Sequence, residues 1–218
     1  MRVYAPRKGS RYERSATVAT RTDTAASRER FLRLTFAGAG TLTLGAVLAA
    51  GAPRGGLSGT SQARDIEILN YALLLGELQA AFYRRALRRA GLTGELREYA
   101  EVVAGHKREH VRLLRGALGA NARPAPRFAF GDAVSSPARF AATAITLEEL
   151  GVAAYNGQAT NLSKPALQAA ARIVSVNARH AAWIRAIQDK RPASQPTDEA
   201  KTRREVLAQV DSTGFVRS

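Results

Sequence analysis

The sequence predicts an all-α protein: an antiparallel four-helix bundle with a long crossover between its second and third helices. Three observations lead to this class. Apolar residues recur at steps of three and four through most of residues 64–190, no stretch of strand length alternates between polar and apolar residues, and the Pro-containing segment 120–136 interrupts the helical period. A chain of 218 residues is long enough to bury one substantial core.

The first two helices are expected at residues 64–90 and 94–118, where Gly91 and Gly119 end them. Each carries one apolar stripe on which residues three and four apart share a face. The first stripe consists of Ile66, Leu69, Leu73, Gly76, Ala80, Tyr83 and Leu87, and the second of Leu96, Tyr99, Val103, His106, His110, Leu113 and Ala117.

The third helix is expected at residues 137–160, because a Pro suits the first turn of a helix. The fourth runs to about Asp189, with Ser163 as its cap and Pro165 in its first turn. The bundle thus occupies residues 64–190, and residues 191–218 form a C-terminal tail with a short helix at 198–210.

The N-terminal segment, residues 1–52, has the composition of an export signal. Residues 1–33 hold nine Arg or Lys and three acidic residues, whereas residues 34–52 are uncharged and end in the small residues 49–52. A basic region, an apolar region and a small-residue cleavage zone are the parts of such a signal. Residues 53–63, rich in Gly and Ser, are expected to form a linker.

The segment Ser27–Arg33 resembles the twin-arginine export motif, with Glu29 at the place of its second arginine. An ordinary secretory signal, an uncleaved membrane anchor and a buried core helix remain as alternatives. We therefore expect an exported protein in the extracytoplasmic space or cell envelope, anchored to the membrane if the signal is uncleaved.

An internal repeat relates the two halves of the bundle. The stretch LGELQAAFY in the first helix corresponds to LEELGVAAY in the third, and KREH in the second to NARH in the fourth. In di-iron bundles, the first helix of each pair supplies a Glu and the second a Glu-x-x-His, whose two ligands share a helix face.

The stretches DIEILNYALLLGELQAAFY, HVRLLRGALG, ITLEELGVAAY and AARIVSVNARHAAWIR resemble the bacterial ferritin-like domain family, in the branch that includes desiccation-related proteins and often carries twin-arginine signals. The resemblance covers residues 64–215. It implies a ferritin-like four-helix bundle. Family members with a complete site retain carboxylate and His ligands for two irons, but the branch has no settled activity that could be assigned to this protein.

Three positions depart from that ligand pattern: Gly76, Lys107 and Asn177 stand where it has Glu. The remaining ligand types are His110, Glu148 and His180. One carboxylate beside an ammonium cannot offset the charge of two iron ions. We therefore expect no cofactor; iron or manganese is the alternative, bound by the three remnant ligands.

By the repeat, Lys107 points to the place in the core where the third helix presents Glu148. A buried carboxylate without a partner is costly, so the lysine would supply the charge that a metal supplies elsewhere. We expect Lys107 to pair with Glu148 in a hydrogen-bond network completed by Asn177, His110 and His180. The alternative is that Lys107 extends to solvent at the bundle rim.

Several other side chains have simpler interpretations. His106 and His110 could form a zinc pair, but a surface or core-rim pair is the preferred reading. Glu77 and Glu149 are expected on the surface. Tyr83 and Tyr155 are expected in the core, with their hydroxyls hydrogen-bonded near the bundle centre.

Net charge is +15, and basic side chains gather on the first two helices. They could form one positive face for an anionic envelope polymer or lipid, whereas an export signal argues against nucleic acid. The alternative is a solvated face. The residues concerned are Arg84, Arg85, Arg88, Arg89, Arg108, Arg112 and Arg115.

Three functions follow from these patterns. The first is a non-catalytic exported protein with a structural or stress-protective role in the envelope, which is not an enzyme. The second is a metal-dependent oxidase or iron-storage protein, and the third a polyanion-binding module. The lack of cysteine excludes thiolate metal sites and a cysteine nucleophile, while formation of a homo-oligomer stays open.

Overall fold

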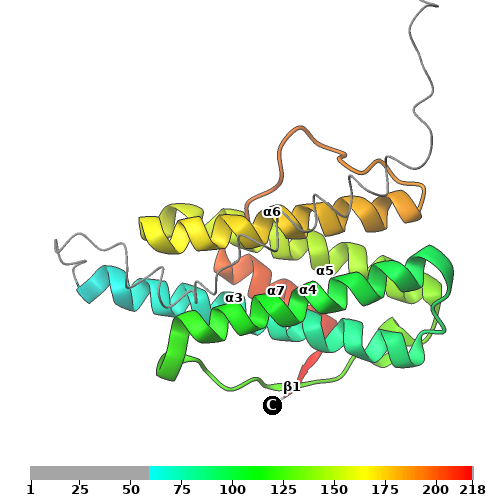
Figure 1. Ribbon diagram of the computed structural model, residues 1–218, viewed down its shortest axis with the longest axis horizontal. Helices are drawn as coiled ribbons and strands as arrows, with labels where there is room; N and C mark the ends of the chain where they lie inside the picture. The colour runs from blue at the N-terminus through cyan, green and yellow to red at the C-terminus, as the bar shows by residue number, and fades with distance from the viewer. Residues whose placement is uncertain (1–58, 218) are drawn as a thin grey trace, which may run out of the picture. The chain divides into compact units, whose positions relative to one another are not determined.

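The computed structural model describes residues 59–217, with side chains from residue 61 onward, and all of them belong to one compact unit. The expected export signal and the first part of the linker lie outside the described residues. The predicted all-α fold is confirmed, with four long helices packed side by side (Figure 1). None of the described helices has the length and hydropathy needed to cross a bilayer. The four are α3 Gly59–Arg89, α4 Gly94–Leu118, α5 Pro137–Gln158 and α6 Lys164–Ile187.

The helix ends agree closely with the sequence signals. Gly91 and Gly119 have φ values of 64° and 54°, a region that favours glycine. The start of α3 at Gly59 is earlier than predicted, because no proline interrupts the last part of the expected linker. Ser163 is the cap residue of α6, but its hydroxyl donates to the Asp65 carboxylate instead of capping its own helix.

The crossover between α4 and α5 is held against the bundle by Asn70. The side-chain oxygen of Asn70 accepts from the backbone N–H of Arg123 at 2.8 Å, and its amide donates to the carbonyl of Asn121 at 2.9 Å. Further along the crossover, Phe130 and Val134 are buried in the core. The crossover comprises the 3₁₀ turns Gly119–Asn121 and Gly131–Val134 and the strand β1 Arg127–Phe128.

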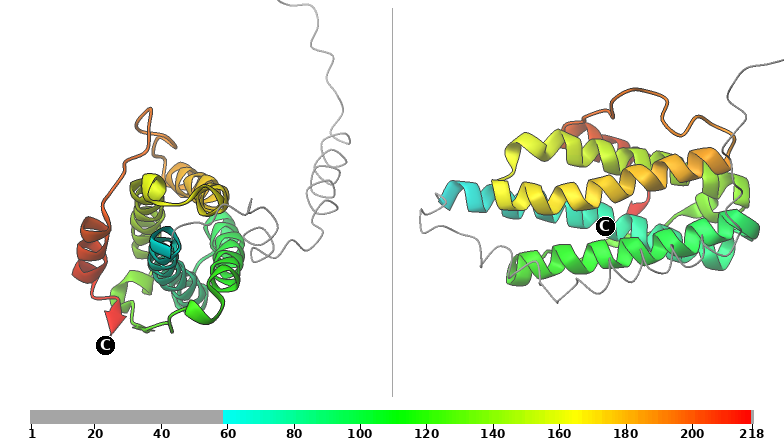
Figure 2. Two further views of the ribbon diagram at one scale, coloured as in Figure 1. Left: turned by 90° about the vertical axis from the view of Figure 1, so that its left-hand side faces the viewer. Right: turned by 45° about the horizontal axis from the view of Figure 1, so that its top comes forward.

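The C-terminal segment, expected as a tail, is packed against the bundle. Its helix α7 spans Arg203–Thr213, later than the predicted start, because Thr202 and Glu205 form a capping box. Val206 and Val210 enter the same core cluster as the four long helices. The left view of Figure 2 looks along the bundle and shows α7 on its outside, beside α5. Beyond α7, strand β2 Val216–Arg217 pairs antiparallel with β1.

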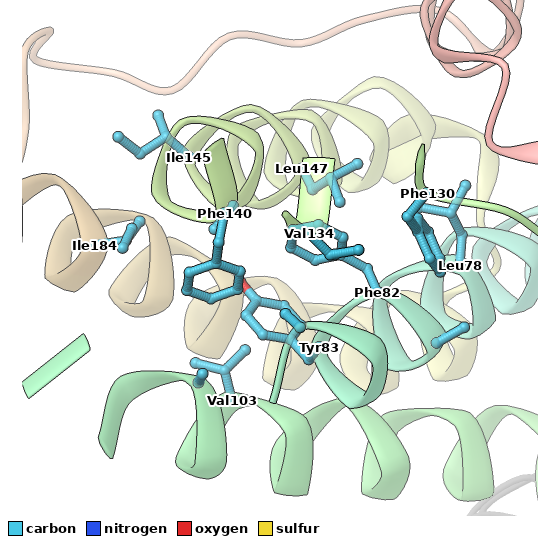
Figure 3. Packing of buried hydrophobic residues seen from close by; sticks show 14 of the residues in the cluster. Leu78, Phe82, Tyr83, Val103, Phe130, Val134, Phe140, Ile145, Leu147 and Ile184 are labelled. Carbon is cyan, nitrogen blue, oxygen red and sulfur yellow. The ribbon is translucent and has the colours of Figure 1, made fainter. Parts of the chain in front are cut away.

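Aromatic rings fill the core where the crossover meets the helices (Figure 3). The ring of Phe82 stacks on that of Phe140 with centroids 5.5 Å apart, and Tyr83 meets Phe140 edge-on at 5.8 Å. Phe130 contacts Phe82 edge-on at 5.6 Å. This packing fixes α3 against α5, and it orients the hydroxyl of Tyr83.

The C-terminal segment approaches α5 so closely at Gly157 that any side chain there would collide. An added Cβ would lie 1.8 Å from the carbonyl oxygen of Lys201. We expect Gly157→Ala to destabilise the protein by about 1–3 kcal/mol and to speed amide exchange at Lys201, whose N–H donates to the Ala153 carbonyl. Thermal unfolding and hydrogen exchange measure both effects.

The control is Gly116→Ala on α4, where an added Cβ meets nothing. This change should stabilise the helix by up to about 1 kcal/mol. Equal behaviour of the two variants would contradict the close approach at Gly157.

Candidate functional site

The interior of the bundle contains a group of buried polar side chains contributed by all four long helices. Each lies on the buried face of its helix, so the periodicity that packs the core also turns these groups inward. We call this group the Lys107 cluster. Its members are Tyr83 from α3, Tyr99, Lys107 and His110 from α4, Glu148 from α5, and Asn177 and His180 from α6.

An ion pair between Lys107 and Glu148 lies at the centre of the cluster. Lys107 Nζ is 2.7 Å from Glu148 Oε2, and the two side chains are 1% and 0% exposed. The ammonium also donates to Asn177 Oδ1 at 2.9 Å. The contact expected from the sequence is therefore present, and the alternative in which Lys107 extends to solvent is wrong.

The second oxygen of Glu148 accepts a hydrogen bond from a tyrosine. The hydroxyl of Tyr83 donates to Glu148 Oε1 at 2.9 Å. Because Tyr83 has one hydroxyl hydrogen, the 2.9 Å contact between the Tyr83 and Tyr99 hydroxyls is a donation from Tyr99. Tyr99 was missed as a site residue, although its place on the stripe of α4 and the need of a buried hydroxyl for a partner were visible in the sequence.

The electrostatics of the cluster favour the charged pair. Burial raises the pKa of Glu148, but the Lys107 ammonium and the His180 ring outweigh it and hold the pKa of the carboxyl well below its usual range. Burial lowers the pKa of Lys107, and Glu148 opposes that effect. Burial and the charge of Glu148 raise the pKa of Tyr83 and of Tyr99, so both remain neutral donors.

The three histidines lie near one another but do not form the predicted network. His180 Nδ1 is 3.3 Å from Glu148 Oε2, without the alignment of a hydrogen bond. His180 Nε2 instead lies 2.8 Å from Nδ1 of the exposed His106, and the two rings stack. His110 Nδ1 is buried without a hydrogen-bond partner among the described residues. His106 and His110 therefore do not converge as a zinc pair would.

The buried His110 predicts a loss of stability in mild acid. Burial, with Lys107 and His180 nearby, lowers the pKa of His110 to about 3. Because the unfolded chain takes up this proton near pH 6.5, the stability from neutral His110 is complete above that pH and is lost as the pH falls toward 3. In denaturant unfolding, the slope from this proton should rise from about 0.7 kcal/mol per pH unit at pH 6.5 to about 1.4 kcal/mol per pH unit near pH 4.5.

The variant His110→Gln should flatten this slope. His106→Gln is the control: burial lowers the pKa of His106 also, but the ring is exposed and the effect on the slope should be smaller. If His110→Gln leaves the pH dependence of the free energy of unfolding unchanged, another group takes up the proton.

Two glutamates expected on the surface behave differently. Glu77 is only 8% exposed, so that expectation is wrong, and its carboxylate pairs with Arg115 of α4. Burial raises the pKa of Glu77, and Arg115 opposes this. Glu149 is exposed, as expected, and pairs with Arg185 at 2.5 Å.

Gln79 is a further buried polar residue that the sequence analysis did not identify. Its amide donates to the carbonyl of Leu147, next to Glu148 on α5. A Cβ at position 151 would lie 3.0 Å from the Gln79 amide nitrogen, so Gly151 gives this side chain its room. The contact fixes α5 against α3 beside the ion pair.

The residues of the predicted positive face are spread along α3 and α4. Arg84, Arg85, Arg88 and Arg89 lie at the C-terminal end of α3, Arg108 lies in the middle of α4, and Arg112 and Arg115 lie toward the C-terminal end of α4. The helices are antiparallel, since Tyr83 lies opposite Tyr99 and Glu77 opposite Arg115. Arg112 is thirteen residues beyond Tyr99, a separation of about 20 Å along the helix. Arg112 and Arg115 also pair with Glu109 and Glu77.

Helical bundles of this architecture can hold two irons through several carboxylates and histidines. The Lys107 cluster does not fit such a centre, because Glu148 is its single carboxylate and both oxygens already accept from Lys107 and Tyr83. Among residues 61–217, no three His, Asp or Glu side chains are arranged to hold a metal ion.

Four long helices, a long crossover and inward polar residues from every helix define a ferritin-like bundle protein. A family model described as a ferritin-like domain matches residues 64–190, and the chain belongs to this family. A search of curated proteins found no match to the sequence.

Proposed function

We propose that this protein is an exported ferritin-like domain protein without di-iron chemistry, acting as a non-catalytic structural or stress-protective component of the cell envelope. The observation that carries the proposal is the buried ion pair of Lys107 and Glu148 at the centre of the bundle. In this account the ammonium takes the place of the positive charge of a metal centre.

The positions of the substitutions support this account. In the repeat, Gly76, Lys107 and Asn177 correspond to the Glu positions of a di-iron bundle. Lys107 Nζ donates both to the remaining carboxylate, Glu148, and to Asn177 Oδ1. Replacing the other Glu residues is therefore chemically coherent with keeping Glu148, because the side chains that face Glu148 balance its charge and satisfy its hydrogen bonds.

Export is the second part of the proposal. It rests on the basic residues 1–33, the uncharged residues 34–52 and the resemblance to the desiccation-related, twin-arginine-exported branch. Fractionation of cells that express the full chain should recover the protein outside the cytoplasm, whereas a chain lacking residues 1–52 should stay inside as a soluble helical domain. If the truncated chain is unfolded, residues 1–52 are needed for folding, and the export part of the proposal is wrong.

Metal content tests the loss of di-iron chemistry. Protein purified from a host supplemented with iron and manganese should carry well below one metal ion per chain and should not accelerate the oxidation of ferrous iron. Two ions per chain, with rapid iron oxidation, would replace this proposal with the oxidase or storage function of His110, Glu148 and His180.

A further inference from the structure

Four arginines lie at the C-terminal end of α3, where the short turn at residues 90–93 leads into α4 (Figure 1). Successive residues of an α-helix are rotated by about 100°, so the four positions fall within an arc of about 140° and share one face. Three of the side chains are exposed, and that of Arg85 is half-buried. We call this face the α3 arginine patch, and it consists of Arg84, Arg85, Arg88 and Arg89.

The charges of the patch are not balanced within the described part of the chain. None of the four guanidinium groups forms an ion pair or a side-chain hydrogen bond with a described residue. No Asp or Glu occurs between Glu77 and Glu95. Those two carboxylates accept instead from Arg115 and from the indole N–H of Trp183. Four neighbouring positive charges are therefore left for a partner.

The helix itself does not explain the patch. Cations in the last turn of a helix are favoured by the macrodipole, which accounts for Arg88 and Arg89. Arg84 and Arg85 lie a turn earlier, and each is four residues before another arginine. Like charges at that spacing destabilise a helix. An anionic partner would relieve this repulsion.

The arrangement of the arginines suits a flat anionic surface better than a polymer strand, which is bound along a positively charged groove. All four side chains project from one helix, and the neighbouring α4 supplies no second wall. Arg97 of α4 pairs with Glu101. Arg108 lies about 14 Å farther along the bundle than the contact between the Tyr83 and Tyr99 hydroxyls.

We propose that the α3 arginine patch docks the protein onto the surface of a bilayer rich in anionic lipids. Clusters of four or more basic residues on a helix are typical of such contacts, and four arginines raise the affinity by up to roughly 1000-fold. Leu87 lies between them but packs against the core, so the guanidinium groups contact lipid phosphates without insertion of the helix. The choice of a lipid rests on the export part of the proposed function, because the uncharged residues 34–52 direct the chain to a membrane.

Vesicle sedimentation with the full chain tests the patch. The probes are mixed phosphatidylglycerol–phosphatidylcholine vesicles, compared with vesicles of phosphatidylcholine alone. Changing all four patch arginines to Gln should weaken binding to the anionic vesicles at least about 10-fold. A control variant with the same change in net charge, spread over the bundle, should bind less than about threefold more weakly. Its substitutions, at exposed arginines, are Arg64→Gln, Arg108→Gln, Arg172→Gln and Arg204→Gln.

A second measurement locates the contact, because residues 1–33 are also basic. Anionic vesicles should slow the modification of the four patch arginines by phenylglyoxal, followed by mass spectrometry, and should leave that of Arg172 and Arg204 unchanged. This measurement uses the native chain, so it does not depend on the folding of a variant. Raising the ionic strength from about 0.01 M to about 0.15 M should reduce the protection, since the Debye length falls from about 30 Å to about 8 Å.

Equal weakening by the two variants, equal binding to phosphatidylcholine vesicles, or no protection of the patch would overturn the proposal. Protection by duplex DNA but not by anionic vesicles would assign the patch to nucleic acid and overturn it as well. Cell fractionation tests export separately, so an exported protein without protection of the patch would overturn this inference alone.

Discussion

Replacing Lys107 with Met should lower the free energy of unfolding by about 3–5 kcal/mol, because the change leaves Glu148 charged and buried without its partner. Glu148 is 0% exposed, so solvent cannot take over the role of the ammonium. Asn177 also loses the donor that its side-chain oxygen accepts. Urea unfolding monitored by far-ultraviolet circular dichroism measures the loss.

Lys164→Met is the matched control, since Lys164 is exposed at the start of α6. Its effect should stay within about 0.5 kcal/mol. If Lys107→Met also lowers the free energy of unfolding by no more than about 0.5 kcal/mol, another group balances the charge of Glu148 and the ion pair does not stabilise the bundle.

The triple change Gly76→Glu, Lys107→Glu and Asn177→Glu should restore tight binding of iron or manganese. It brings three further carboxylates to the bundle beside His110, Glu148 and His180, which completes the donor set of a di-iron bundle. Position 76 has room for a Cβ atom, because an added Cβ would lie 3.4 Å from Val111 Cγ2 and 3.9 Å from Leu114 Cδ1. Metal analysis after dialysis should find at least one ion per chain.

The control is the triple glutamine variant at the same three positions, which has similar side-chain volume but no added charge. It should bind no more metal than the native chain. Without metal, the triple glutamate variant should be destabilised by its clustered carboxylates, and added manganese should raise its unfolding temperature. A folded glutamate variant that binds no metal would contradict the derivation of this cluster from a metal centre.

The four long helices were predictable because each carries an uninterrupted 3.6-residue period with a glycine or proline at its ends. Lys107 and Glu148 could be paired from the sequence for a related reason. The repeat fixes the level of each residue along the bundle, and the helical period fixes its face. Two distant residues that the repeat places at one level, both turned toward the bundle centre, are then expected to meet.

Other contacts depend on geometry that the pattern does not contain. Strands β1 and β2 have two residues each, too short for an alternating pattern, and their pairing joins the crossover to the C-terminal segment, which no local signal relates. Glu77 was assigned to the surface because it follows the core position 76, yet the neighbouring α4 presents Arg115 to it and covers it. The arginines of the predicted positive face are spread along the bundle, because Arg112 and Arg115 lie toward the C-terminal end of α4, which runs antiparallel to α3.

A double-mutant cycle on Lys107→Met and Glu148→Gln tests the central claim most directly, because it isolates the energy with which the two side chains depend on each other. We expect the double variant to lose at least about 2 kcal/mol less stability than the two single variants summed, since it leaves no unpaired buried charge. Losses that add to within about 0.5 kcal/mol would show two independent side chains and would contradict the claim that the ammonium stands in for a metal charge opposite Glu148.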